Sequence, residues 1–263
     1  MHTSPMLPEG SLKGQTAVIT GGGSGIGLGI AEELGRLGAC LVLAGRNLER
    51  LDTAKEGLLG QGFPTIAVAT DVRQPDQVQS LMEKATNQWG SLDILINSAA
   101  GNFLVDSEKL SVNGWNAIVN TVLNGTFYCT RAAGLQMIQQ GHGKILSIVA
   151  SYAWTGGPRT VHSAAAKAGI VAMTRTLAVE WAHYGIRVNA LCPGPTDTEG
   201  ARPLWANPED EIRLRSKIPV GRFGTVEEVA QAASYLVSPY ADYVNGEVLV
   251  MDGGEWLGKG LNS

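Results

Sequence analysis

A lysine, a serine and a tyrosine near the middle of the chain are the residues best suited to proton chemistry. Lys167 lies in the alanine-rich run Ala164–Gly169, and Ser163, four residues earlier, shares its face of a predicted helix. A serine hydroxyl is too weak an acid to donate a proton near neutral pH, whereas a phenol, with a pKa of about 10, can be tuned toward neutrality. The nearest tyrosine upstream is Tyr152, fifteen residues before Lys167. The segment therefore indicates either an acid at Tyr152 or a chain that has lost its acid.

A cluster of glycines follows the first apolar run, where the chain reads TGGGSGIGL from Thr20 to Leu28. Glycines allow a tight turn and let the main chain approach a pyrophosphate, which then sits at the positive end of a helix. A glycine cluster taken alone is also compatible with an ordinary turn. Its place between a strand pattern and an amphipathic helix favours a dinucleotide site. The predicted cofactor-binding residues of this turn are Thr20, Gly21, Gly23, Ser24, Gly25, Ile26 and Gly27.

The residue after the second apolar run predicts which nicotinamide cofactor the turn would hold. An acidic side chain at this point would bind the adenosine ribose hydroxyls and select NAD. Gly45 and Arg46 stand there instead, and a guanidinium suits a 2′-phosphate, so we expect NADPH; a solvated surface arginine is the alternative. Asp71 and Val72 close the third run and could contact the adenine, although a turn aspartate is equally compatible.

Short apolar runs alternate along the chain with stretches of helical spacing. Because strands that alternate with helices form right-handed crossovers, we expect an α/β fold with a parallel sheet covered by helices on both faces. A helix is predicted from Thr225 to Leu236, with Thr225 and Glu228 forming a capping box. The predicted strands are Ala17–Thr20, Cys40–Ala44, Ile66–Thr70, Leu92–Asn97, Lys144–Val149, Arg187–Cys192 and Val248–Met251.

Length, charge and apolar runs limit the class of protein. The 263 residues suit one large domain, which we place at residues 1–263, with a loose tail at 1–12 and a substrate lid at about 193–219. A net charge of −4 gives no indication of nucleic-acid binding, and no apolar run reaches the roughly 18 residues of a membrane span. The three cysteines are expected to be buried thiols, and a cytoplasmic location is the default expectation.

Together these motifs resemble the short-chain dehydrogenase/reductase family over nearly the whole chain. The resemblance implies a single Rossmann-like doubly wound domain with a seven-stranded parallel sheet, hydride transfer with a nicotinamide, and a homotetramer with helices at about 112–139 and 161–183 in its interfaces. The matching segments are Thr20–Leu28, Asp71, Asn97–Gly101, Asn124, Lys167, Arg187–Asn189, Pro193–Pro195 and Asp252–Gly254.

The chain departs from the family where the chemistry occurs. Members normally carry a tyrosine four residues before the lysine and a serine thirteen residues before that tyrosine, whereas this chain has Ser163 and Ala150. The NADPH-dependent 2,4-dienoyl-CoA reductases show the same departure and place their acid fifteen residues before the lysine, which is Tyr152 here. They also carry the loop sequence AAGNF, present as Ala99–Phe103.

The resemblance implies a role for each residue. Lys167 would bind the nicotinamide ribose, Tyr152 would donate a proton to a dienoyl thioester, and Asn102 would stabilise the thioester oxygen, with Ser163 and Asn124 completing the catalytic set. The further implied cofactor contacts are Asn97, Ala99, Lys167, Pro193, Gly194, Pro195 and Thr196. The implied contacts to an acyl-CoA substrate are Arg46, Arg73, Asn102, Phe103, Ser111 and Arg202.

Three alternatives remain at this point. The chain could be another short-chain reductase, acting on a 2-enoyl-CoA or on a 3-ketoacyl substrate. It could also be a catalytically silent NADP(H)-binding protein that has kept the glycine turn and lost its acid at Ser163.

Overall fold

The computed structural model describes residues 6–202 and 207–258 and contains the predicted parallel sheet. Its seven strands pair in the order β3-β2-β1-β4-β5-β6-β7, and every pairing is parallel. The strands are β1 Thr16–Thr20, β2 Cys40–Gly45, β3 Thr65–Ala69, β4 Ile94–Asn97, β5 Gly143–Ile148, β6 Ile186–Pro193 and β7 Val248–Met251. All seven predicted strands are confirmed, with ends that differ by at most two residues.

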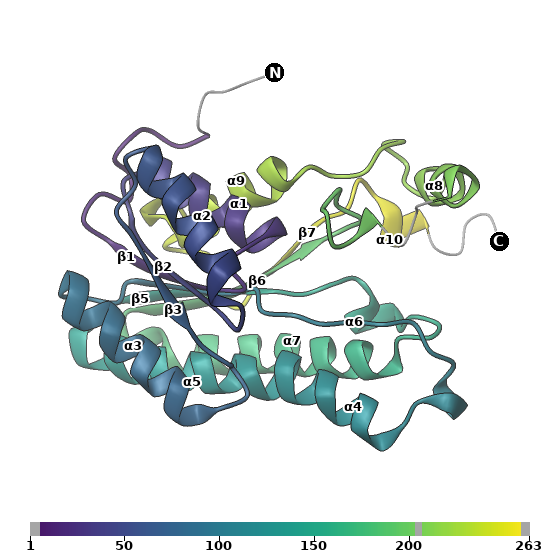
Figure 1. Cartoon of the computed structure of the whole chain (residues 1–263), viewed down its shortest axis with the longest axis horizontal. Coiled ribbons are helices and arrows are strands. Elements are labelled where there is room, and N and C mark those ends of the chain that lie inside the picture. Colours follow the sequence, from purple (N-terminus) through teal and green to yellow (C-terminus); the bar gives the residue numbers. More distant parts are fainter. Residues whose placement is uncertain (1–5, 203–206, 259–263) are drawn as a thin grey trace.

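Two layers of helices bury the faces of this sheet, as Figure 1 shows. Alternate side chains of each central strand point to opposite layers: Ile19 joins one core, and Val18 joins the other. Because helices cover both faces of the sheet, the strands are nearly continuous apolar runs and do not alternate between polar and apolar residues. One layer holds α1 Gly25–Arg36, α2 Leu48–Gly60 and α9 Val226–Val237, and the other holds α3 Pro75–Trp89, α5 Gly125–Gln140 and α7 Val161–Trp181.

Shorter elements lie mainly at the carboxyl ends of the strands, on the side of the molecule where Figure 1 shows α6, α8 and α10. The strand order reverses at β1 and β4, which places a crevice at this edge. The shorter helices are α4 Val112–Val119, α6 Tyr152–Thr155, α8 Pro208–Arg215 and α10 Glu255–Gly258, with 3₁₀ turns at Ser107–Lys109, Ala182–Tyr184 and Pro239–Ala241.

The helix expected at about 112–139 is interrupted by a π-helical segment. Residues Asn120–Asn124 form this segment between α4 and α5, and its Leu123 packs so closely on α7 that a Cβ at Gly169 would lie 2.9 Å from it. A π-bulge of this kind often marks a functional site, because it re-aims the side chains around it. The predicted capping box of α9 is confirmed, since Thr225 accepts from the Glu228 amide and Glu228 accepts from the Thr225 amide.

The loose tail expected at residues 1–12 is wrong from Leu7 onward. Leu7 and Leu12 are buried in the core formed with α1 and α9, because this segment folds back along the sheet and Leu12 bonds to the backbone of Leu37. Residues 1–5 lie outside the described residues. No helix within 6–202 and 207–258 is long and apolar enough to cross a bilayer.

Candidate active site

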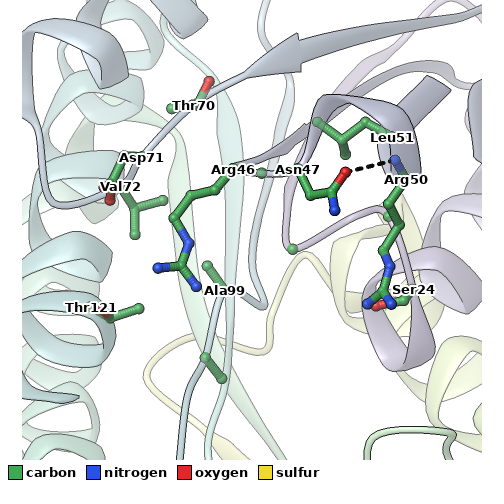
Figure 2. A pocket seen from close by; sticks show the side chains of 14 residues that line it. Ser24, Arg46, Asn47, Arg50, Leu51, Thr70, Asp71, Val72, Ala99 and Thr121 are labelled. Carbon is green, nitrogen blue, oxygen red and sulfur yellow. Dashed lines mark hydrogen bonds between the residues drawn. The ribbon is translucent and has the colours of Figure 1, made fainter. Parts of the chain in front are cut away.

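A cavity of about 640 Å³ opens at the carboxyl edge beside the glycine turn (Figure 2). It is lined by seven of the seventeen residues predicted to hold a dinucleotide and extends from the turn to the first residues after β3. The lining residues are Gly21, Gly23, Ser24, Gly45, Arg46, Asn47, Arg50, Leu51, Thr70, Asp71, Val72, Ala99, Ala100 and Thr121.

The glycine turn can only have this shape because Gly21, Gly25 and Gly27 lack side chains. A Cβ at Gly27 would lie 2.3 Å from the carbonyl oxygen of Gly21, so any larger residue would push α1 away from the turn. Gly21 and Gly25 have φ values of +69° and +53°, in the left-handed region that favours glycine. The N-cap residue Ser24 makes no side-chain capping bond, which leaves its hydroxyl available to a ligand.

Two polar residues of the predicted cofactor set support the edge of the sheet from inside. Thr20 is buried, and its hydroxyl accepts hydrogen bonds from the amides of Ser98 and Ala99, both at 3.1 Å. Asn97 is also buried and donates to the hydroxyls of Thr130 and Ser147. Neither side chain lines the cavity, so both hold the loop that does.

A second arginine, which the sequence analysis missed, lines the cavity with Arg46. In Figure 2 the guanidinium of Arg46 lies toward Ala99 and that of Arg50 toward Ser24. Neither guanidinium forms an ion pair with any residue in 6–202 or 207–258. Asn47 caps α2 by accepting from the Arg50 amide, and this cap directs the first turn of the helix along the cavity. The two positive groups therefore make this end of the cavity suitable for an anion.

Asp71 and Arg73 form a close pair at the same mouth. The guanidinium of Arg73 contacts both carboxylate oxygens of Asp71, with Nε at 2.9 Å and 3.0 Å. Hydrogen bonds from Arg73 hold the pKa of Asp71 below its usual value. Arg73, predicted as a substrate contact, thus bonds to a residue of the cofactor cavity.

The predicted catalytic tyrosine, serine and lysine lie on two helices that are in contact, α6 and α7. The hydroxyl of Tyr152, in the first turn of α6, lies 3.0 Å from the hydroxyl of Ser163 in α7. Burial raises the pKa of Tyr152, and the hydrogen bond with Ser163 partly opposes that rise. Ser163 is almost fully buried, so its hydroxyl orients the phenol.

Lys167 lies one turn further along α7, almost fully buried. Its ammonium donates to the carbonyl oxygen of Ile148 at 2.5 Å. Burial lowers the pKa of this lysine to about 8. A lysine buried here is close to losing its charge, so its proton is sensitive to pH near neutrality.

Other predicted catalytic and substrate residues lie on the loop after β4, at the start of α4 and in the π-helical segment. Asn124 ends the π-helical segment and donates to Asn120 at 2.8 Å. Asn102 is exposed, and its carbonyl oxygen accepts from the amide of Phe103 at 3.0 Å. Ser111 caps α4 by accepting from the amide of Gly114.

The segment after β6 is bonded mainly to itself and to the C-terminal strand. Gly194 packs so closely on Asp252 that a Cβ would lie 2.6 Å from the Cβ of that residue, and Thr196 donates to the carbonyl of Gly194. Gly194 and Pro195 line a separate cavity of about 410 Å³, together with Val220. Arg202 is exposed and donates to Asp197. Of the predicted lid, residues 203–206 lie outside the described residues. The predicted contacts of Pro193–Thr196 and of Arg202 with ligands stay predictions.

A family model described as "Enoyl-(Acyl carrier protein) reductase" matches residues 21–255 of the chain. This model covers the glycine turn, the tyrosine and lysine helices and the last strand of the sheet. The chain belongs to the short-chain dehydrogenase/reductase family.

Relatives place this reductase in the dienoyl-CoA reductase-like branch. It is 44% identical to a "Probable 2,4-dienoyl-CoA reductase [(2E)-enoyl-CoA-producing]" of Bacillus subtilis, over 92% of this chain and 97% of that protein. It is 42% identical to a "Peroxisomal 2,4-dienoyl-CoA reductase [(3E)-enoyl-CoA-producing]" of Pongo abelii, over 94% of this chain and 85% of that protein. A crystal structure of a short chain dehydrogenase from Bacillus anthracis matches with a TM-score of 0.85 and 47% identity, covering 93% of this chain and 97% of that one.

The chain is therefore an oxidoreductase that binds a nicotinamide cofactor. The cavity at the glycine turn has the residues to hold such a cofactor. The amides of the turn would hold a pyrophosphate, while Asp71, Val72, Ala99 and Ala100 line the rest of the cavity.

The stability of the reductase should depend on pH through Lys167. Because the pKa of this lysine falls to about 8 on folding, the unfolded chain binds more protons between about pH 8 and pH 10.5, and the free energy of unfolding rises with pH in that window. Across this pH window, the free energy of unfolding of the unmodified reductase should rise by about 2–3 kcal/mol relative to that of Lys167→Met. Urea unfolding at pH 7.5 and pH 10 measures the difference; a pH-independent difference would contradict burial of a charged lysine.

Proposed function

We propose that this enzyme uses NADPH to reduce 2,4-dienoyl-CoA thioesters to 3-enoyl-CoA products. The observation that carries the proposal is the 3.0 Å contact between the hydroxyls of Tyr152 and Ser163, one helical turn from the buried Lys167. A phenol thus stands beside the position that the family normally fills with its acid. This arrangement favours a moved acid over a lost one.

NADPH is supported by the charges of the cavity. Arg46 and Arg50 both line it without a described ion-pair partner, and Gly45 leaves space beside them. A 2′-phosphate would offer each guanidinium a charge-assisted hydrogen bond, whereas an unmodified ribose would leave both positive charges without a partner.

The chemistry divides between the cofactor and the chain. When bound, NADPH supplies a hydride, which adds to the δ-carbon of the conjugated thioester. Negative charge then spreads through the dienolate to the thioester oxygen. The Asn102 amide and the Tyr152 hydroxyl stabilise that charge, and Tyr152 transfers its proton to the α-carbon, leaving a double bond between the β- and γ-carbons.

Lys167 and Ser163 prepare Tyr152 for this step. The ammonium of Lys167 favours the ionised form of a nearby phenol, while the Ser163 hydroxyl fixes its direction. Burial raises the pKa of Tyr152, so the phenol stays protonated until charge develops on the substrate. A carbonyl reductase protonates oxygen at the site of hydride attack, but a dienoyl thioester needs the proton several atoms away. The different position of the acid follows from that need.

The acyl-CoA part of the proposal is supported by the loop that follows β4. Phe103 is 42% exposed at the mouth of the site, where its ring can flank an acyl chain. Arg73 and Arg202 are exposed cations that can reach phosphates of coenzyme A, and Ser111 lies near Phe103. Both relatives described above are named for the same thioester class.

A 2-enoyl reductase is the second candidate, because the matching family model is described by that activity. Such an enzyme would protonate the α-carbon after hydride attack at the β-carbon, and a phenol next to Lys167 would serve as the proton donor. Ser163 in the usual acid position argues against it.

We further propose that four copies assemble into a homotetramer through α5 and α7. Phe127, Leu135 and Val179 are large apolar residues of these helices and remain 46%, 46% and 80% exposed. Light scattering of the purified chain should give four times its mass of 27.7 kDa, and a monomer at micromolar concentration would contradict the assignment.

Replacement of the proposed acid should separate catalysis from cofactor binding. Tyr152→Phe removes only the hydroxyl, so reduction of 2,4-hexadienoyl-CoA should fall by more than about 100-fold while the Kd for NADPH changes little. NADPH oxidation is followed with 2,4-dienoyl-, 2-enoyl- and 3-ketoacyl-CoA side by side. Tyr243→Phe, on a fully exposed side chain, is the matched control. Near-normal turnover in Tyr152→Phe would rule out this acid, and no activity with any thioester would favour the silent NADP(H)-binding protein.

The two arginines of the cavity should select the phosphorylated cofactor. Arg46→Ala and Arg50→Ala should each weaken NADPH binding by about 10- to 100-fold, because each removes a charge-assisted bond, with little change for NADH. Fluorescence titration with both cofactors provides its own control. Equal losses for NADPH and NADH, or a preference of the unmodified enzyme for NADH, would contradict the proposal.

A further inference from the structure

A fully buried histidine lies beside the catalytic group with no protein partner. His162 precedes Ser163 in the first turn of α7 and is 0% exposed. Among residues 6–202 and 207–258, neither of its ring nitrogens has a hydrogen-bond partner. A buried polar atom without a partner lowers the stability of the fold, so an unpaired ring in a native core calls for an explanation.

The imidazole contacts the loop that carries Asn102. Its ring lies edge-on to the ring of Phe103, with centroids 4.5 Å apart and an interplanar angle of 76°. Further along, the amide of Val105 donates to the carbonyl of Arg159 at 3.0 Å, and the Arg159 side chain pairs with Asp106 at 3.4 Å. The segment 103–106 is therefore fastened to the segment 159–162 at three successive points.

The longer stretch 156–162, which includes this segment, also contacts Tyr152, the proposed acid. A Cβ at Gly157 would lie 3.3 Å from the Cβ of Tyr152, and Ser163 follows His162 directly. Arg159 has φ +65°, and among the described residues it is the one non-glycine residue with positive φ. Strain of this kind is found where the surrounding structure requires an unusual backbone. The segment thus links the Asn102 loop to the Tyr152–Ser163 pair.

Asn102 needs such a link to act on a thioester. Its carboxamide is exposed and accepts from the Phe103 amide, so it is turned toward its own loop. Turning its amide group toward a substrate oxygen removes this acceptor from the Phe103 amide, so the main chain of the loop has to take new partners. The His162 ring packs against Phe103 of this loop, and its two nitrogens have no partner among the described residues, so it can supply one.

We propose that His162 is a positioning residue: when an acyl thioester binds, a ring N–H donates to a main-chain carbonyl of Gly101–Phe103 and fixes Asn102 relative to Tyr152. This inference rests on the proposed function. It explains why a histidine stands where an apolar ring would pack against Phe103 equally well. The stability lost by the unpaired ring is recovered in the reacting complex.

His162→Phe tests this because it keeps an aromatic edge against Phe103 and removes both nitrogens. The variant should unfold at the same or a higher temperature and keep its Kd for NADPH. Its kcat and kcat/KM for 2,4-hexadienoyl-CoA should fall together by about tenfold, because Asn102 is no longer held where it stabilises the transition state. His183→Phe, at an exposed position after α7, is the control and should leave all four quantities unchanged.

A second pair of variants keeps the proposal testable if His162→Phe fails to fold. His162→Gln and His162→Met have similar length, but only glutamine can donate, so His162→Gln should retain several times the kcat of His162→Met. An unchanged kcat in His162→Phe, or equal rates in the Gln and Met variants, would overturn the positioning role. If the unmodified enzyme instead prefers a 2-enoyl or 3-ketoacyl thioester, the proposed function fails, and the same variants are compared on that substrate. No activity of the unmodified chain with any thioester would overturn both.

Discussion

The hydrogen bond between Tyr152 and Ser163 joins two elements that the rest of the structure has to hold in place. At 3.0 Å it sets the direction of the Tyr152 hydroxyl, and Ser163 lies one helical turn from the buried Lys167. α7 provides both Ser163 and Lys167, one turn apart, while α6 provides Tyr152 from the end of β5. If either helix shifted by one residue, the phenol would lose its orienting bond.

The parallel sheet explains why these elements meet the cofactor cavity. Parallel strands end at a common edge, so the glycine turn after β1, Arg46 after β2, Asp71 after β3 and Tyr152 after β5 converge there. Buried polar residues then fix the edge from inside, as Thr20 does for the loop at Ala99. On the other side of the site, His162, Arg159 and their contacts tie the Asn102 loop to the segment that precedes Ser163.

Much of this arrangement could be predicted from the sequence, because the relevant signals are local. Uninterrupted apolar runs identify doubly covered strands, and Gly21, Gly25 and Gly27 indicate a turn that a Cβ would obstruct. The direction of a side chain is not a local property, which is why the inward orientation of Thr20 and Asn97 was not foreseen. Arg50 was missed because its place in the cavity depends on how Asn47 starts α2. Leu7 was assigned to a tail because the short apolar pair Met6 and Leu7 gives no periodicity.

The central claim, that the acid has moved because the proton is needed away from the site of hydride attack, is tested by where that proton goes. The two relatives are named for different products, a (2E)-enoyl-CoA and a (3E)-enoyl-CoA, which differ only in protonation at the γ- or the α-carbon. The direct measurement is NMR of the product formed from 2,4-hexadienoyl-CoA and NADPH in deuterated water. The account predicts deuterium on the α-carbon and a double bond between the β- and γ-carbons. Deuterium on the γ-carbon with a 2-enoyl product would contradict it.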